Sequence, residues 1–221
     1  MATDLLVTPS VSILNKDAET LGVTLAQTLG HMARAINVMK LGAAVGEGGG
    51  MQVGVDLLTR SPSNKTLRGL STTEVPRLIP DDEVHVEVQN DNDYPVDLNV
   101  LYVGSDYSIS HMFAGRMQPG DTLKKGLLRI TDEAFGRDRV VMVMTPAKSQ
   151  TAVENLGFLA QDAVELTRDT TKRGKTGLAG ALMEAGFGET TRAASALIDE
   201  EAEAGPAPMI LQFEIDTVPG T

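Results

Sequence analysis

The chain has no cysteine and no tryptophan, and aromatic residues make up only 4% of its 221 positions. Without cysteine it has no disulfides, no thiolate metal ligands and no cysteine nucleophile. Hydrophobic residues still amount to 42% of the chain, so its core must be built mostly from Val, Leu, Ile, Met and Ala. The lack of cysteine does not decide the compartment.

Long apolar runs are also missing. No run approaches the about 20 residues that a membrane helix needs. The first residues lack a basic region followed by an apolar stretch, so we expect no signal peptide, a cytoplasmic protein and no membrane partner. The net charge is −11. Because an acidic chain is repelled by phosphate backbones, we expect no nucleic-acid partner.

Residues 1–45 are predicted to form an arm and an amphipathic helix. Asn15 or Asp17 can cap this helix, which we expect to run to about Leu41. Its apolar residues recur at spacings of three and four, which predicts one apolar stripe: Leu21, Leu25, Leu29, Met32, Ile36 and Met39. "GEGGG", residues 46–50, favours neither helix nor strand and is interpreted as a linker.

Residues 51–221 are predicted to form a mainly β domain, an antiparallel β-sandwich of about seven or eight strands. In "VHVEVQ" the valines 84, 86 and 88 alternate with polar residues, which is typical of a half-buried strand. "RVVMVMTP" is apolar on both faces and indicates a central strand. Residues 150–205 break the pattern, so we expect a helical excursion there before the last strand, "MILQFEID".

Several short motifs occur in a recognisable order over residues 33–215. They are a strand ending in Asn90, then "LNVLYVGSDYSIS", Phe113, the "QPGD" turn, and "FG" just before a strand that ends near Thr145. In this order they resemble a domain of unknown function found C-terminal to bacterial caspase-like peptidases. The resemblance implies that residues 33–41 correspond to the helix that joins the peptidase to this domain.

The chain departs from that family in one respect that decides its chemistry. A caspase-like peptidase needs a cysteine nucleophile paired with a histidine, and there is no cysteine here. The resemblance therefore implies a non-catalytic interaction or regulatory domain, which binds a protein partner. That partner is expected to be a caspase-like peptidase domain or a second copy of the chain.

The residues expected to bind that partner lie in two places. Within the helix, the apolar stripe must bury against the sandwich or against a partner, and Met32, Ile36 and Met39 are the candidates. Within residues 167–177, a basic loop in an otherwise acidic chain offers Arg168, Lys172, Arg173 and Lys175. This loop contacts an acidic partner, is a cleavage site for a protease, or is only a flexible charged loop.

Two polar groupings are candidate metal sites. His85 and His111 would share a face if their strands were neighbours, but no third ligand has suitable spacing, so hydrogen-bonded strand histidines are the alternative. Residues 90–93, Asn-Asp-Asn-Asp, offer oxygen ligands for Ca²⁺, yet such residues also dominate turns. We therefore assign no metal and no cofactor.

Catalytic motifs are not evident. The sequence has no phosphate-binding glycine loop, no Gly-x-Ser-x-Gly elbow and no carboxylate pair that stands out from the others. We expect no enzyme activity. Two further hypotheses stay open: a small-ligand or glycan-binding sandwich acting through the turns at 90–93 and 104–106, and a hydrolase with an unrecognised carboxylate site.

Overall fold

A computed structural model describes residues 17–45, 50–70, 74–132, 135–148, 150–162 and 207–220. Within these residues the chain forms one long helix, nine strands and one short 3₁₀ helix, η1. In chain order the elements are α1 (Ala18–Val45), β1 (Val53–Ser61), β2 (Asn64–Gly69), β3 (Arg77–Leu78), β4 (Glu83–Asn90), β5 (Val96–Val103), β6 (Ile109–Met117), β7 (Thr122–Arg129), β8 (Gly136–Pro146), η1 (Gly157–Leu159) and β9 (Met209–Thr217).

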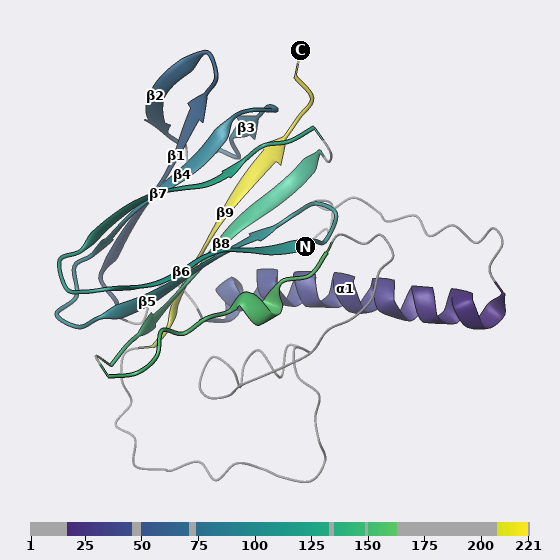
Figure 1. Ribbon diagram of the computed structural model, residues 1–221, viewed down its shortest axis with the longest axis horizontal. Helices are drawn as coiled ribbons and strands as arrows, with labels where there is room; N and C mark the ends of the chain where they lie inside the picture. The colour runs from purple at the N-terminus through teal and green to yellow at the C-terminus, as the bar shows by residue number, and fades with distance from the viewer. Residues whose placement is uncertain are drawn as a thin grey trace, which may run out of the picture.

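The strands form two sheets that pack face to face, and α1 lies beneath the five-stranded sheet (Figure 1). The four-stranded sheet has the order β2-β1-β4-β7, and the five-stranded sheet has the order β3-β9-β8-β5-β6. All neighbouring strands are antiparallel except β3 and β9. The predicted mainly β sandwich is confirmed. The described residues contain nine strands rather than seven or eight, and the two least regular are the exposed edge strand β2 and the two-residue strand β3, which lies in a proline-containing stretch.

The order of the longer strands identifies the type of sandwich. Without β2 and β3, one sheet is β1-β4-β7 and the other is β9-β8-β5-β6. This is the strand order of an immunoglobulin-like sandwich, in which the chain passes from one sheet to the other between β4 and β5, β6 and β7, and β7 and β8. The crossings bring segments distant in sequence, such as β1 and β7, onto either side of β4.

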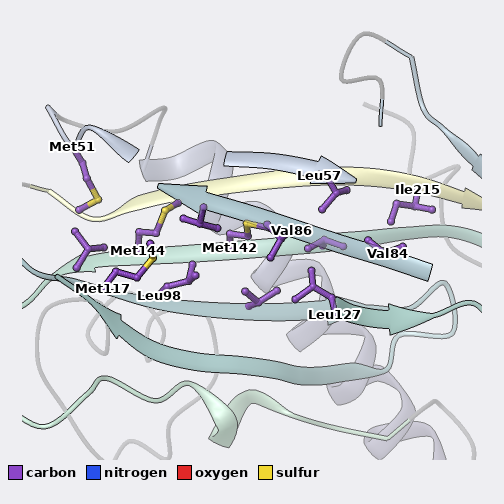
Figure 2. Packing of buried hydrophobic residues seen from close by; sticks show 14 of the residues in the cluster. Met51, Leu57, Val84, Val86, Leu98, Met117, Leu127, Met142, Met144 and Ile215 are labelled. Carbon is purple, nitrogen blue, oxygen red and sulfur yellow. The ribbon is translucent and has the colours of Figure 1, made fainter. Parts of the chain in front are cut away.

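The core between the sheets is aliphatic and rich in methionine. Val84, Val86 and Val88 of β4 are all buried and point toward the five-stranded sheet, as their alternation predicted. Figure 2 shows Val84, Val86 and Leu98 packed with Met142 and Met144 of β8. Flexible methionine side chains fill the space that a sandwich with more aromatic residues would fill with rings.

The opposite face of the five-stranded sheet is also buried. Leu101 and Val103 of β5 and Val141 and Val143 of β8 point away from the inter-sheet core and pack beneath α1 and η1. The central position predicted for residues 139–146 is therefore confirmed. Strand β5 lies between β6 and β8 in the sheet and is likewise covered on both sides.

Helix α1 begins where the sequence indicated and ends slightly later. The backbone N–H of Thr20 donates to the Asp17 side chain at 2.7 Å, which is an N-terminal cap. The helix continues to Val45 rather than ending near Leu41. Its most deeply buried side chains are Ala35 and Val38, which face the sheet. Neither residue belongs to the predicted stripe. The short side chain of Ala35 contributes little to an apolar pattern but allows the helix to approach the sheet closely.

The expected helical excursion at 150–205 is only partly described. Residues 150–162 are mostly extended and contain only the three-residue η1, so the predicted helix is wrong over this stretch. Hydrogen bonds with Asp97 and Asn99 of β5 and with Arg116 of β6 hold the backbone of this stretch across the sheet. Residues 163–206 lie outside the described residues, as do residues 46–49 of the predicted linker.

Replacing Leu98 by Ala should lower the free energy of unfolding by about 3 kcal/mol, because Leu98 is fully buried between the sheets and a cavity would remain. Urea denaturation at neutral pH measures this change. Leu67→Ala is the matched control: Leu67 lies on β2 and is 43% exposed, so its loss should change stability by no more than about 0.5 kcal/mol. Equal losses in the two variants would contradict the described core.

Candidate interaction surfaces

The two halves of α1 lie in different environments. The C-terminal half packs on β8 and β9, and the Gln212 side chain of β9 donates to the backbone carbonyl of Met39 at 2.7 Å. The N-terminal half extends beyond the edge of the strands (Figure 1). There Val23, Leu25 and Leu29 are 54%, 43% and 61% exposed. Leu25 and Leu29, four residues apart and on the same face of the helix, form a candidate docking surface.

The apolar stripe and the packed face of α1 are on different sides of the helix. Leu25, Leu29, Met32, Ile36 and Met39 follow one another at spacings of four, three, four and three, the spacing of a coiled-coil seam. With 3.6 residues per turn, this stripe lies about a third of a turn away from Ala35 and Val38. The stripe therefore runs along the side of the docked helix rather than beneath it.

Met32, Ile36 and Met39, predicted to bind a partner, are half-buried at the border of the core beneath α1. These three residues contact the sandwich, whereas Leu25 and Leu29, at the N-terminal end of the same stripe, are exposed to solvent. The sequence pattern identified the stripe but could not indicate which part of it the sheet covers. The basic-loop candidates Arg168, Lys172, Arg173 and Lys175 lie outside the described residues.

The histidines do not form a pair. His85 is on β4 in the four-stranded sheet, and its Nε2 lies 3.1 Å from Glu83 Oε2. His111 is on β6 in the five-stranded sheet, and its Nε2 lies 3.2 Å from Asn99 Oδ1. Burial lowers the pKa of His111. The hypothesis of a shared face is wrong, since the two strands belong to different sheets. The described part of the chain has no group of three or more His, Cys, Asp or Glu residues that could hold a metal ion.

The Asn-Asp run at 90–93 ties one end of the sandwich together. The Asn90 amide donates to the carbonyl oxygens of Tyr94, Met117 and Gln118 at 3.1 to 3.2 Å. Its oxygen accepts hydrogen bonds from the backbone and side-chain N–H groups of Asn92. Asn92 in turn pairs with both backbone groups of Gln52, at 2.8 Å each. These amides are therefore occupied by the protein's own backbone.

The turn at 104–106 is likewise held from inside. Asp138 of β8 is buried and accepts hydrogen bonds from the Ser105 N–H at 2.7 Å and the Thr217 hydroxyl at 3.0 Å. Burial raises the pKa of the Asp138 carboxyl, and burial likewise raises the pKa of the nearby Tyr102 phenol. The polar groups that the ligand-binding hypothesis assigned to the two turns thus mainly organise the turns themselves.

A largely buried ion pair attaches Lys148, Thr151 and Ala152 to the five-stranded sheet. Arg116 of β6 donates two hydrogen bonds to Asp97 of β5, at 2.7 and 2.8 Å. The remaining Arg116 donors reach the carbonyl oxygens of Lys148, Thr151 and Ala152. Every strong donor of this guanidinium serves the fold, so Arg116 is not available to a ligand.

Glu83 organises a second charged cluster, on the outer face of the four-stranded sheet. In the strand register Arg60 of β1 and Arg129 of β7 lie directly opposite Glu83 of β4, one on each side. Arg60 pairs with Glu83 Oε2, and Arg129 Nη2 lies 2.9 Å from Glu83 Oε1. Arg60, and after it His85 and Arg129, lower the pKa of Glu83 to about 2. The cluster borders a pocket of about 540 Å³.

Comparison with known proteins adds no relative: the chain matches no protein-family model, no curated protein and no solved structure. Within the described residues, no helix combines the length and the apolar character needed to cross a membrane. The strand order and the packing of α1 define the class of the described residues: an immunoglobulin-like sandwich with a docked helix whose N-terminal half extends beyond the strands.

Replacing Asn90 by Ala should lower the free energy of unfolding by about 3 kcal/mol, because it leaves several buried carbonyl and amide groups without partners. Chemical denaturation measures the loss. Asp91→Ala is the control, since the Asp91 side chain is exposed and accepts a hydrogen bond only from the Gln89 side chain. An Asn90→Ala variant as stable as the control would refute the structural role of this run.

Replacing Glu83 by Gln should reduce the dependence of stability on acid pH. Because the pKa of Glu83 is lower in the folded state, from 4.5 to about 2, its stabilising contribution is present above pH 4.5 and lost as the pH falls toward 2. Other carboxylates titrate equally in both proteins. The difference in unfolding free energy between wild type and Glu83→Gln should therefore shrink between pH 5 and pH 2; a constant difference would contradict the cluster.

Proposed function

We propose that this chain is a non-catalytic interaction or regulatory domain that binds a protein partner through the exposed stripe of α1. The observation that carries the proposal is the position of Leu25 and Leu29, which are 43% and 61% exposed on a helix whose other end is fixed to the sandwich. A rigidly mounted apolar helix loses little conformational entropy on binding, so its apolar area contributes efficiently to affinity.

The resemblance to the module that follows bacterial caspase-like peptidases supports one partner class. In that arrangement α1 is the element nearest the peptidase. We therefore propose a peptidase domain as the partner. The proposed location is the bacterial cytoplasm. A second copy of the chain is the competing partner, because a stripe at heptad spacing is complementary to itself. The lack of cysteine supports a non-catalytic role. The net charge of −11 weighs against nucleic-acid and anionic-membrane partners.

The test is a binding measurement with the double variant Leu25→Glu and Leu29→Glu. Sedimentation velocity up to about 100 µM detects self-association, and titration calorimetry measures binding to a caspase-like peptidase domain encoded in the same or the adjacent gene. The double variant should weaken the complex at least about tenfold, because it places charges in the apolar contact. Gln27→Glu is the control, since Gln27 is exposed on the other side of the same helix.

A wild-type chain that stays monomeric over this range and does not bind the peptidase domain would refute the proposal. Equal weakening by Gln27→Glu would also refute it, because the effect would then come from charge alone. Circular dichroism of each variant confirms that α1 and the sandwich remain folded.

A further inference from the structure

The pocket beside Glu83 has a local excess of positive charge. It lies on the outer face of the four-stranded sheet, on the side of the sandwich opposite α1. Arg60, Lys65 and Arg129 line it together with Asp81 and Glu83. Three cations face two carboxylates, so the pocket carries one net positive charge in a chain whose net charge is −11. Its volume of about 540 Å³ is within the range of small-ligand pockets.

Glu83 holds the two arginines in place without using all their donors. Each guanidinium has five N–H groups. Arg60 gives Glu83 its Nε and Nη2 atoms, and Arg129 gives Nη2 alone. The two side chains remain 39% and 62% exposed, whereas Glu83 is only 22% exposed. Because the pKa of Glu83 is lowered to about 2, this carboxylate stays ionised and keeps the arginines positioned at neutral pH.

Lys65 gives the pocket its net positive charge, because the charges of Arg60 and Arg129 are balanced by Asp81 and Glu83. It is exposed on β2, and its side chain makes no hydrogen bond or ion pair with the described residues. The β1–β2 hairpin places it at the pocket edge near Arg60. A free ammonium group next to two fixed guanidinium groups is an arrangement that favours an oxyanion, which can accept hydrogen bonds from all three.

We propose that this pocket binds an oxyanion group, a carboxylate or a phosphate, carried by a small ligand or a side chain. The site is independent of the α1 surface and extends the function proposed above. Arg60 and Arg129 position the anion through the donors that Glu83 leaves free, and Lys65 adds the attraction that selects for negative charge. Long-range repulsion by the acidic chain is screened at physiological salt, whereas contacts inside the pocket are not.

The experiment is an NMR titration of the ¹⁵N-labelled chain with inorganic phosphate and, separately, with citrate as a source of carboxylates. Sodium chloride at matched ionic strength measures the effect of screening alone. Binding of each anion is measured from the chemical-shift changes of the backbone amides in β1, β2 and β7. We expect saturable shifts at the pocket for at least one anion, and Lys65→Ala should weaken that binding about three- to tenfold. Lys65→Arg should restore most of it.

Arg68→Ala is the matched control, because Arg68 is an exposed cation on the same strand but does not line the pocket. It should change the affinity less than about twofold. Saturation by phosphate alone or by citrate alone supports the proposal and identifies the group that binds. Shifts that equal those in sodium chloride, or equal weakening by Arg68→Ala and Lys65→Ala, would overturn it.

Discussion

The five-stranded sheet is buried on both faces, and the rest of the molecule depends on this. Its inner face packs against the valines of β4, and its outer face packs beneath α1 and η1. A sheet with two covered faces needs apolar residues at successive positions, which explains why β8 reads as Val-Val-Met-Val-Met in the sequence. With no tryptophan, this double core is formed by many small aliphatic contacts.

The segments that cover the outer face of the five-stranded sheet, α1 and the chain around η1, must be attached to it. Polar side chains provide this attachment at several points. Asp97 and Asn99 of β5 point outward and bind the backbone of Glu154 and Leu156, while Arg116 binds carbonyl groups of residues 148–152. Gln161 donates to the carbonyl oxygens of both His31 and Tyr107, and so links α1 to the β5–β6 turn. Asp97, Asn99, Arg116 and Gln161 each bond backbone groups, which makes the attachment specific in position.

The two outer surfaces of the molecule consequently differ in character. On the four-stranded sheet, charged residues oppose one another across the strands, as in the pairs Arg60–Glu83 and Lys124–Glu87. On the other side, α1 presents apolar residues beyond the edge of the sheet. A molecule built in this way offers a polar, charge-selective surface and an apolar helical surface on opposite sides of one rigid sandwich, and the two can act independently.

The sequence alone determined the sandwich, the inward valines of β4, the central position of β8 and the start of α1 to within two residues, with Asn15 or Asp17 as its cap. These features follow from local periodicity and capping, which depend on neighbours in the chain. Only the tertiary structure decided which side of α1 faces the sheet, that residues 150–162 are extended, and that His85 and His111 lie apart. It also brought Arg60, Lys65 and Arg129 together around Glu83. Those outcomes depend on contacts between strands far apart in the sequence, whose register no local pattern specifies.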